Sequence, residues 1–413
     1  MPRDTKARSK PSAPGPGEAL EARVAQVWFW EGAFVRRGID LQQHFHPDPL
    51  LVTDLDLLAI EIDPTLGFRR TIGEAKSGTS KSTPKPLDRV IWLRGLMEVT
   101  GAGAAELTSE LVPSDRVRQL ADGLGVQAHS TKDLERREAN LRLDEVADRG
   151  VFGLKWLGEA ETVRRGCSGE SELERAFWFL RSEVWFLDPF AALKRTLSAM
   201  RVLSSRWTPE ARDGHEFAVR WLLSEATVVA ALNLVGIAGY AVRRGSQGFD
   251  EFVDARLAEG SVPAHQMRAI ARSFDEYLTG VLTELGAPKT AIVQALGAFE
   301  PEPPAYSPSV AELGRRLAAG AVHARHLPRW ADLMVFERVV REQEPGAVVA
   351  ERLGAGELAK VTHAARLVGA FLKTQGNLPA PFVAALGSDV SESASRAAAS
   401  AGETEAQLSL PEA

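Results

Sequence analysis

Two segments near the N-terminus combine apolar residues with regularly placed charges. Residues 53–60 read Thr-Asp-Leu-Asp-Leu-Leu-Ala-Ile, and residues 72–78 read Ile-Gly-Glu-Ala-Lys-Ser-Gly. Each has the mixture of apolar and polar residues that is typical of a strand in a sheet. Side chains two residues apart on a strand face the same way. A hairpin of the two segments therefore predicts that Asp56, Glu74 and Lys76 lie on one side of a sheet.

This set of side chains suits a particular chemistry. Two carboxylates on neighbouring strands bind Mg²⁺ or Mn²⁺ through oxygen ligands, and the carbonyl of Ala75 lies beside them. A lysine next to such a site can orient a water molecule or offset the charge that develops on a phosphate. The three charged residues, Asp56, Glu74 and Lys76, therefore indicate metal-assisted hydrolysis of phosphodiester bonds.

The pattern resembles the PD-(D/E)XK nuclease superfamily, whose fold is that of the restriction endonucleases. In that family an acidic residue on one strand is followed, on the next strand, by Asp or Glu, any residue and Lys. Here Asp56 precedes Glu74-Ala75-Lys76. The literal Pro-Asp pair is absent, and an alternative alignment places Asp54 at its position.

The resemblance also implies residues and elements outside the motif. Family members often carry a further glutamate on the first helix, which implies Glu21, with Glu18 as the second choice. We expect that helix to begin near Glu18 and a strand to begin near Phe34. Further helices are expected at 88–99 and 114–124, and strands at 104–111 and 126–129. The resulting order of helix, three strands, helix, strand, helix and strand is the core order of the family and covers about the first third of the chain.

The net charge of the chain is -6, so any nucleic-acid surface must be local. Basic residues gather in the sequence around the predicted site, where they would contact phosphates without reading sequence. The alternative is a solvated loop, because residues 76–86 lack apolar periodicity. The expected partner is a nucleic acid, taken as DNA, and its expected contacts are Arg69, Arg70, Lys81, Lys85 and Arg89.

The remaining sequence predicts the domain organisation. Residues 1–16 read as a disordered basic tail, 17–140 as the nuclease-like α/β domain with a central mixed sheet, 141–387 as a large all-α domain, and 388–413 as a disordered tail. Residues 135–140 are expected to be a charged link. The α/β domain is expected to cover both sheet faces with its own helices. The helical domain would then recognise substrate, a protein partner or a second copy of the chain.

Several classes of protein are disfavoured. Residues 226–242 are apolar and uncharged, but we interpret them as a buried helix, so no membrane partner is expected. The single cysteine, Cys167, excludes an internal disulfide and fits a reducing cytoplasm. The pairs His44/His46 and His323/His326 lack a further ligand at zinc spacing.

Together these features predict a cytoplasmic, Mg²⁺-dependent endonuclease that serves prokaryotic defence (restriction or anti-phage activity) or DNA repair. The alternative is a non-catalytic DNA-binding or protein-interaction scaffold on the same fold. An assay for metal-dependent cleavage separates the two hypotheses.

Overall fold

The computed structural model describes residues 15–43, 50–80, 83–146, 153–208, 214–245, 247–259, 264–288, 302–346 and 358–387, with residues 290, 349, 352 and 353. Both predicted tails lie almost wholly outside the described residues. His44, His46 and Lys81 also lie outside them.

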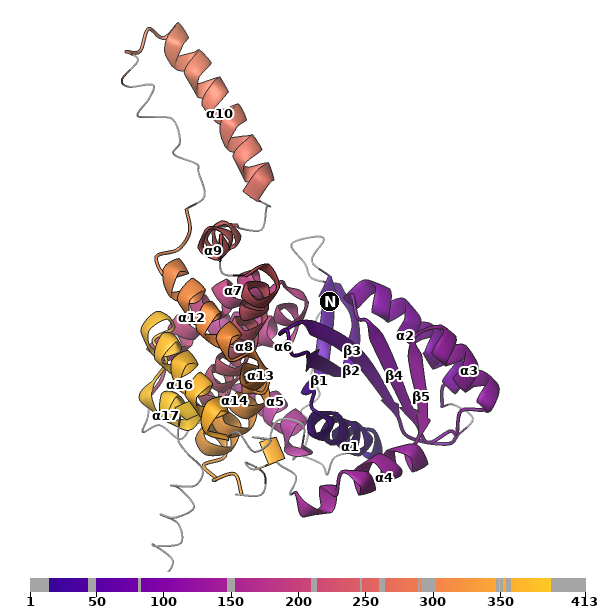
Figure 1. Cartoon of the computed structure of the whole chain (residues 1–413). Helices are drawn as coiled ribbons and strands as arrows, with labels where there is room; N and C mark the ends of the chain where they lie inside the picture. The colour runs from indigo at the N-terminus through magenta and orange to yellow at the C-terminus, as the bar shows by residue number, and fades with distance from the viewer. Residues whose placement is uncertain are drawn as a thin grey trace, which may run out of the picture.

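The N-terminal part is a five-stranded mixed sheet with helices, in an α+β arrangement (Figure 1). The strands lie in the order β1-β2-β3-β4-β5, in which the first two pairs are antiparallel and the last two are parallel. The predicted order of elements is confirmed. The elements are α1 (Pro16–Glu31), β1 (Phe34–Gln43), β2 (Leu50–Ile62), β3 (Phe68–Lys76), α2 (Pro86–Thr100), β4 (Ala104–Ser109), α3 (Asp115–Gly123), β5 (Val126–Ser130) and α4 (Thr131–Asn140).

Helix α1 packs closely on the sheet because of one glycine. A Cβ atom on Gly73 of β3 would lie 2.4 Å from the ring of Trp28. The indole Nε1 of Trp28 donates a hydrogen bond to Glu106 Oε2 at 3.0 Å, which fixes the ring over β3 and β4. Gly73 directly precedes Glu74, and successive residues on a strand face opposite sides, so α1 packs on the face of β3 opposite the Glu74 side chain.

The predicted link at residues 135–140 is wrong, because these residues form the end of helix α4. Ser130 and Asp133 form a capping box at the start of this helix. Glu138 then pairs with Arg23 of α1 at 2.7 Å. Two of the charges that suggested a solvated link, Arg137 and Glu138, therefore attach the helix to Glu31 and Arg23 of α1.

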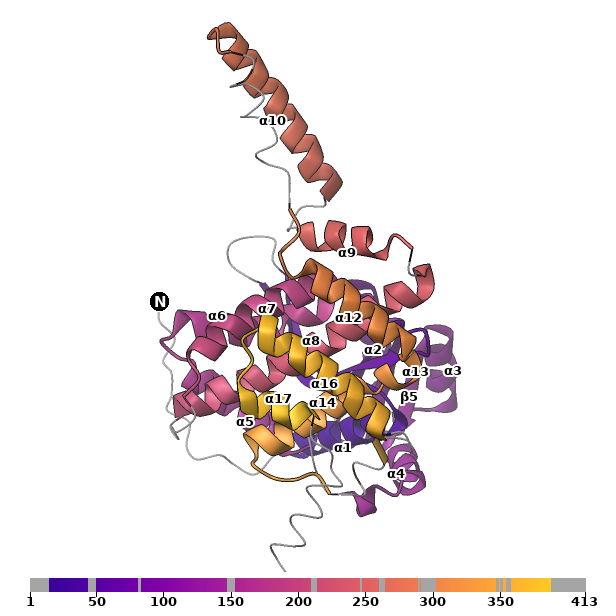
Figure 2. The ribbon, with the colours of Figure 1, turned by 60° about the vertical axis from the view of Figure 1, so that its left-hand side comes forward.

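The rest of the chain is helical, and no strand occurs in its described residues (Figure 2). The central helix α8 is long and apolar enough to cross a membrane, and its most apolar window is entirely buried inside the protein. The helical elements are η1 (Leu143–Glu145), α5 (Lys155–Gly166), α6 (Ser171–Arg181), η2 (Glu183–Phe186), α7 (Pro189–Ser205), α8 (Gly214–Arg244), α9 (Phe249–Ala258), α10 (Ala264–Glu284), α12 (Ser307–Ala319), α13 (Ala321–Ala324), α14 (Leu327–Val335), η3 (Phe336–Val340), α16 (Leu358–Gln375) and α17 (Ala380–Gly387).

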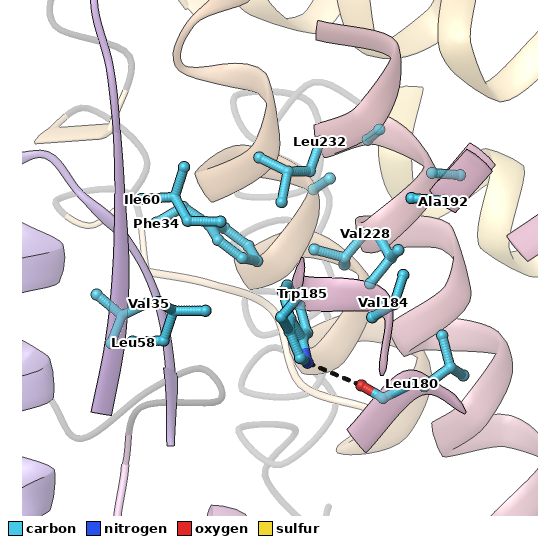
Figure 3. Close-up of a cluster of buried hydrophobic side chains, with 14 of the residues drawn as sticks. Phe34, Val35, Leu58, Ile60, Leu180, Val184, Trp185, Ala192, Val228 and Leu232 are labelled. Carbon is cyan, nitrogen blue, oxygen red and sulfur yellow. Dashed lines mark hydrogen bonds between the residues drawn. The ribbon is translucent and has the colours of Figure 1, made fainter. Parts of the chain in front are cut away.

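The two parts share one hydrophobic core, so the expectation that the α/β unit covers both sheet faces with its own helices is wrong. Figure 3 shows Phe34 and Ile60 of the sheet facing Trp185, Val228 and Leu232 of the helical part. One face of β1–β3 is covered by η2 and α8, while α1 lies on the other face. Removal of the helical part would expose this apolar face to water.

A buried ion cluster also joins the two parts. Arg36 of β1 is 2% exposed. Its Nε lies 2.8 Å from Glu225 Oε1 of α8, and its Nη1 donates to Asp332 Oδ2 of α14 at 3.0 Å. Two buried carboxylates thus share one guanidinium. Burial, together with Glu225 and against the effect of Arg36, raises the pKa of Asp332 to about 7.

This shift predicts a pH dependence. Folded protein binds the Asp332 proton more tightly than unfolded protein, whose carboxyl titrates near 3.8, so this group lowers stability as pH rises from about 4 to 7. Asp332→Asn should remove that loss and gain stability relative to the parent, by at most about 1.4 kcal/mol per pKa unit. Urea unfolding at pH 5 and pH 8 measures the difference in unfolding free energy between variant and parent. If this difference is the same at both pH values, Asp332 is ionised in the folded protein over that whole range.

Candidate active site

The register of β2 and β3 brings the predicted acidic residues together. Leu57 lies opposite Gly73 in this antiparallel pair. Continuing the same register places Asp56 opposite Glu74, and directly opposite side chains lie on the same face of the sheet. Ala75 N donates a hydrogen bond to Asp56 Oδ2 at 3.0 Å, which holds the carboxylate against β3.

A single ammonium group bridges the two carboxylates. Lys76 Nζ lies 3.1 Å from Asp56 Oδ2 and 3.1 Å from Glu74 Oε1. Burial acts to lower the pKa of Lys76, but the two carboxylates outweigh it, so the net pKa is raised and the lysine stays charged. The structure therefore brings Asp56, Glu74 and Lys76 into one cluster.

Glu74 is the most buried member of this cluster, with a side chain 2% exposed. Burial raises the pKa of its carboxyl, and Lys76 and Arg89 act against the rise. Arg89, in the first turns of α2, forms an ion pair with Glu74 Oε1 and stacks on the Trp92 ring at 4.3 Å. Neither carboxylate oxygen of Glu74 has a hydrogen-bond partner of good geometry in the described residues, although cations lie beside Oε1.

The donor set fits a hard divalent cation. Asp56 and Glu74 supply two carboxylates, and the Ala75 carbonyl directly follows Glu74 in the sequence. Mg²⁺ commonly binds through one or two carboxylates and keeps several waters. The carboxylate oxygens of Glu74, which lack hydrogen-bond partners of good geometry in the described residues, would then have a cation to coordinate. Within the described residues no three carboxylate, imidazole or thiol side chains lie close enough together to share a metal.

Of the two candidate glutamates on α1, Glu21 is the one whose carboxyl interacts electrostatically with Asp56 and Lys76 of the cluster. Burial, followed by the charge of Asp56, raises the pKa of Glu21 to about 7, while Arg37 at 3.5 Å acts against the rise. Glu18 instead accepts a hydrogen bond from Gly15 N at 3.1 Å and caps the helix.

The alternative ligand Asp54 lies elsewhere. It is exposed and stands opposite Asp40 in the β1–β2 ladder. Burial raises the pKa of Asp40, and the nearby charge of Asp54 raises it further. Asp56, and not Asp54, is the carboxylate that contacts Lys76.

The predicted basic contacts are divided between two places. Arg89 lies in the cluster, and the exposed Lys85 precedes it by one helical turn, as the N-cap of α2. Arg69 and Arg70 lie at the opposite end of β3, about 20 Å from Lys76 at ~3.3 Å per residue. Arg69 pairs with Glu61 there, and burial lowers the pKa of Arg70.

One residue of the site was missed from sequence. Glu110, just after β4, accepts a hydrogen bond from Gly78 N at 2.5 Å and donates its own N–H to the Lys76 carbonyl at 3.1 Å. It holds the start of the loop that follows β3. A glutamate at the end of the neighbouring parallel strand was the available signal, because parallel strands end at the same edge of the sheet.

No family model, curated protein or solved structure matches this chain.

Proposed function

We propose that the chain is a Mg²⁺- or Mn²⁺-dependent endonuclease of the PD-(D/E)XK type, acting on DNA in the cytoplasm in prokaryotic defence or repair. The observation that carries the proposal is the bridging of Asp56 and Glu74 by Lys76 Nζ at 3.1 Å from each. Support comes from the order of elements around it, in which a helix and three strands precede α2 and β4.

Each residue of the cluster has a role in this proposal. Asp56, Glu74 and the Ala75 carbonyl would hold the metal, which when bound supplies positive charge to the phosphate and activates water. Lys76 turns from the carboxylates toward the attacking water or the scissile phosphate. Glu21, with a pKa of about 7, is available to accept a proton or to hold a water in the same region.

Arg89 and Lys85 provide the adjoining phosphate contacts. Arg89 neutralises the buried Glu74, and a metal held by that carboxylate would release the guanidinium to a flanking phosphate. Lys85 lies one turn earlier on the same side of α2 and is exposed.

Lys76→Ala should lower turnover about 100- to 1000-fold, because the ammonium acts on charge that develops in the transition state. The Mg²⁺ concentration for half-maximal rate should change little, since the carboxylates remain. Single-turnover cleavage of labelled DNA across a Mg²⁺ series measures both. Lys85→Ala is the matched control and should weaken DNA binding and its salt dependence while leaving turnover intact. Equal behaviour of the two variants would make Lys76 a plain phosphate contact.

The second candidate is a non-catalytic DNA-binding or interaction scaffold. It is favoured by the ion pairs among Asp56, Glu74, Lys76 and Arg89, which neutralise the cluster without a metal. A scaffold of this kind would bind DNA equally well with and without Mg²⁺ and would cleave none.

For the protein partner, we infer self-association through helix α10. The helix extends away from the body of the protein (Figures 1 and 2). Ile270, Phe274 and Tyr277 lie on one of its faces and are 58%, 41% and 69% exposed. Its charges run from basic to acidic along the sequence, so an antiparallel pair of copies would match opposite charges. The first half contains Arg268 and Arg272, and the second contains Asp275, Glu276 and Glu284.

The double change Phe274→Lys and Tyr277→Lys should convert a dimer into a monomer, because it places like positive charges in the apolar contact between the two copies. Light scattering after gel filtration gives the mass. Val112→Lys, at an exposed position outside α10, is the control and should leave the dimer intact. A parent protein that is monomeric at tens of micromolar would contradict self-association through α10.

A further inference from the structure

Helix α16 carries positive charge and no negative charge. Residues 358–387, which include α16 and α17, contain Lys360, Arg366 and Lys373 but no aspartate or glutamate, in a chain whose net charge is -6. All three basic side chains are exposed, as is His363 between them. A local excess of one charge in a chain of the opposite charge is the pattern expected of a surface that binds a polyanion.

The basic residues lie on one side of α16. Successive residues of an α-helix are turned by about 100°, so Lys360, Arg366 and Lys373 fall within an arc of about 140°. The exposed alanines Ala359 and Ala370 lie near the middle of this arc. Their small side chains leave room for a surface to approach the helix between the flanking lysines.

The opposite side of α16 holds the helix in place. Val361, Ala365, Val368 and Leu372 are buried, and the helix packs on α14 and α17. Arg366 has a structural contact as well, because its Nε donates to the Gly387 carbonyl at the end of α17 at 2.7 Å. The fold therefore fixes α16 through its apolar side and leaves the two lysines at the protein surface.

The neighbouring elements do not neutralise the basic side. Of the described elements that pack most closely on α16, α13 and α17 contain no acidic residue, and the acidic residues of α8 and α14 are buried. The carboxylate of α12 is that of Glu312, which pairs with Arg316 at 2.8 Å and with Arg315 at 3.1 Å. Glu312 is thus already matched by cations of its own helix.

Further cations extend the surface beyond α16. Arg201 of α7 donates from its Nε to the Gln375 carbonyl, at the end of α16, at 2.7 Å. Neither Arg201 nor Lys373 pairs with a carboxylate in the part of the chain that the structure describes. We call the whole surface the α16 face, and it consists of Lys360, Arg366 and Lys373 of α16, Arg201 of α7 and Arg316 of α12. These three helices together contribute one carboxylate, that of Glu312, so the α16 face has a clear surplus of positive charge.

The α16 face is remote from the cluster of Asp56, Glu74 and Lys76. Both views show α16, drawn in yellow, on the outer side of the helical part, away from the sheet (Figures 1 and 2). Duplex DNA is stiff over lengths of about 50 nm, which is far larger than the protein. A duplex that lies on the α16 face is therefore a different stretch of DNA from the one at the cluster.

We propose that the α16 face binds the phosphate backbone of duplex DNA without reading its sequence. Lys360 and Lys373 are about 20 Å apart along the helix axis, at ~1.5 Å per residue, and this length of duplex carries about twelve phosphate charges on its two strands. None of the exposed large apolar side chains of the described residues lies on α16 or α17, whereas a protein partner normally needs apolar anchors. The inference rests on the proposed function, because DNA is the substrate proposed there, and it gives the helical part a second DNA contact.

Fluorescence anisotropy of a short labelled duplex, titrated with the full chain in EDTA over a series of salt concentrations, tests the proposal. The double change Lys360→Gln and Lys373→Gln should weaken binding about tenfold or more near 0.1 M salt, and it should reduce the slope of log Kd against log salt by about 2, because each lysine contact releases a counterion. Arg366 stays unchanged, since it also contacts Gly387.

The matched control is the double change Lys155→Gln and Arg175→Gln, which removes two exposed cations from α5 and α6. It should bind DNA like the parent, and both double variants should melt like the parent. Equal weakening by the two double variants would trace the effect to net charge and overturn the proposal, as would equal affinity and salt slope of the parent and the Lys360/Lys373 variant.

Poly-glutamate separates DNA from an acidic protein segment as the occupant. Tighter binding of poly-glutamate than of the duplex by the parent, with loss of that binding in the Lys360/Lys373 variant, would overturn the proposal. The nuclease function is tested separately by cleavage in Mg²⁺. A chain that cleaves no DNA but loses duplex binding in the Lys360/Lys373 variant would support the α16 face and refute the proposed activity of the cluster.

Discussion

Replacement of Glu74 by Gln should reduce the rate of DNA cleavage at least about a thousandfold, because a metal ligand contributes several kcal/mol to stabilising the transition state. The glutamine keeps the size of the side chain but loses the charge that balances Lys76 and Arg89. Asp56→Asn should have an effect of the same order. Plasmid cleavage followed over time in Mg²⁺ measures both.

Glu98→Gln is the matched control, since Glu98 is a glutamate paired with an arginine, but on the exposed face of α2. It should cleave like the parent. Circular dichroism of Glu74→Gln should match the parent, and loss of one buried carboxylate whose pKa is raised by burial should not lower stability. Full activity of Glu74→Gln or Asp56→Asn would show that these residues hold no catalytic metal.

Replacement of Arg36 by Met should destabilise the whole chain by about 3–5 kcal/mol, because it leaves Glu225 and Asp332 buried without their cation. The loss should appear as one cooperative transition, since the sheet and the helices share a core. Urea unfolding followed by tryptophan fluorescence and by circular dichroism gives the free energy and tests whether the two probes coincide.

Two further variants give this prediction its controls. Arg94→Met breaks only an exposed pair with Glu98 and should cost less than about 1 kcal/mol. Adding Glu225→Gln and Asp332→Asn to Arg36→Met removes the stranded charges and should restore most of the lost stability. Two separate unfolding transitions in the parent would contradict the shared core.

The sequence was sufficient for the part of the site that depends on local geometry. Glu74 and Lys76 are two residues apart on a strand, and the alternation of side chains alone places them on one face. Asp56 follows from a hairpin with few residues between its strands. The order of strands and helices followed in the same way from periodicity and turn residues.

Contacts between residues far apart in the sequence could not be predicted from periodicity and turn residues. Arg36 meets Glu225 and Asp332 across separations of 189 and 296 residues, and no local pattern indicates such a pairing. Arg69 and Arg70 are close to Glu74 in sequence, yet the extended strand carries them away from it. Arg89 is further along the chain but returns to Glu74, because α2 folds back beside β3.

Asp56, Glu74 and Lys76 are proposed to form a metal-dependent phosphodiesterase site. The most direct test of this site is incubation of the purified full chain with supercoiled plasmid in Mg²⁺, in Mn²⁺ and in EDTA, with Glu74→Gln in parallel. The parent should give nicked or linear DNA in either metal, and the plasmid should stay intact in EDTA and with the variant. Cleavage that persists in EDTA, or intact plasmid in both metals, would contradict it.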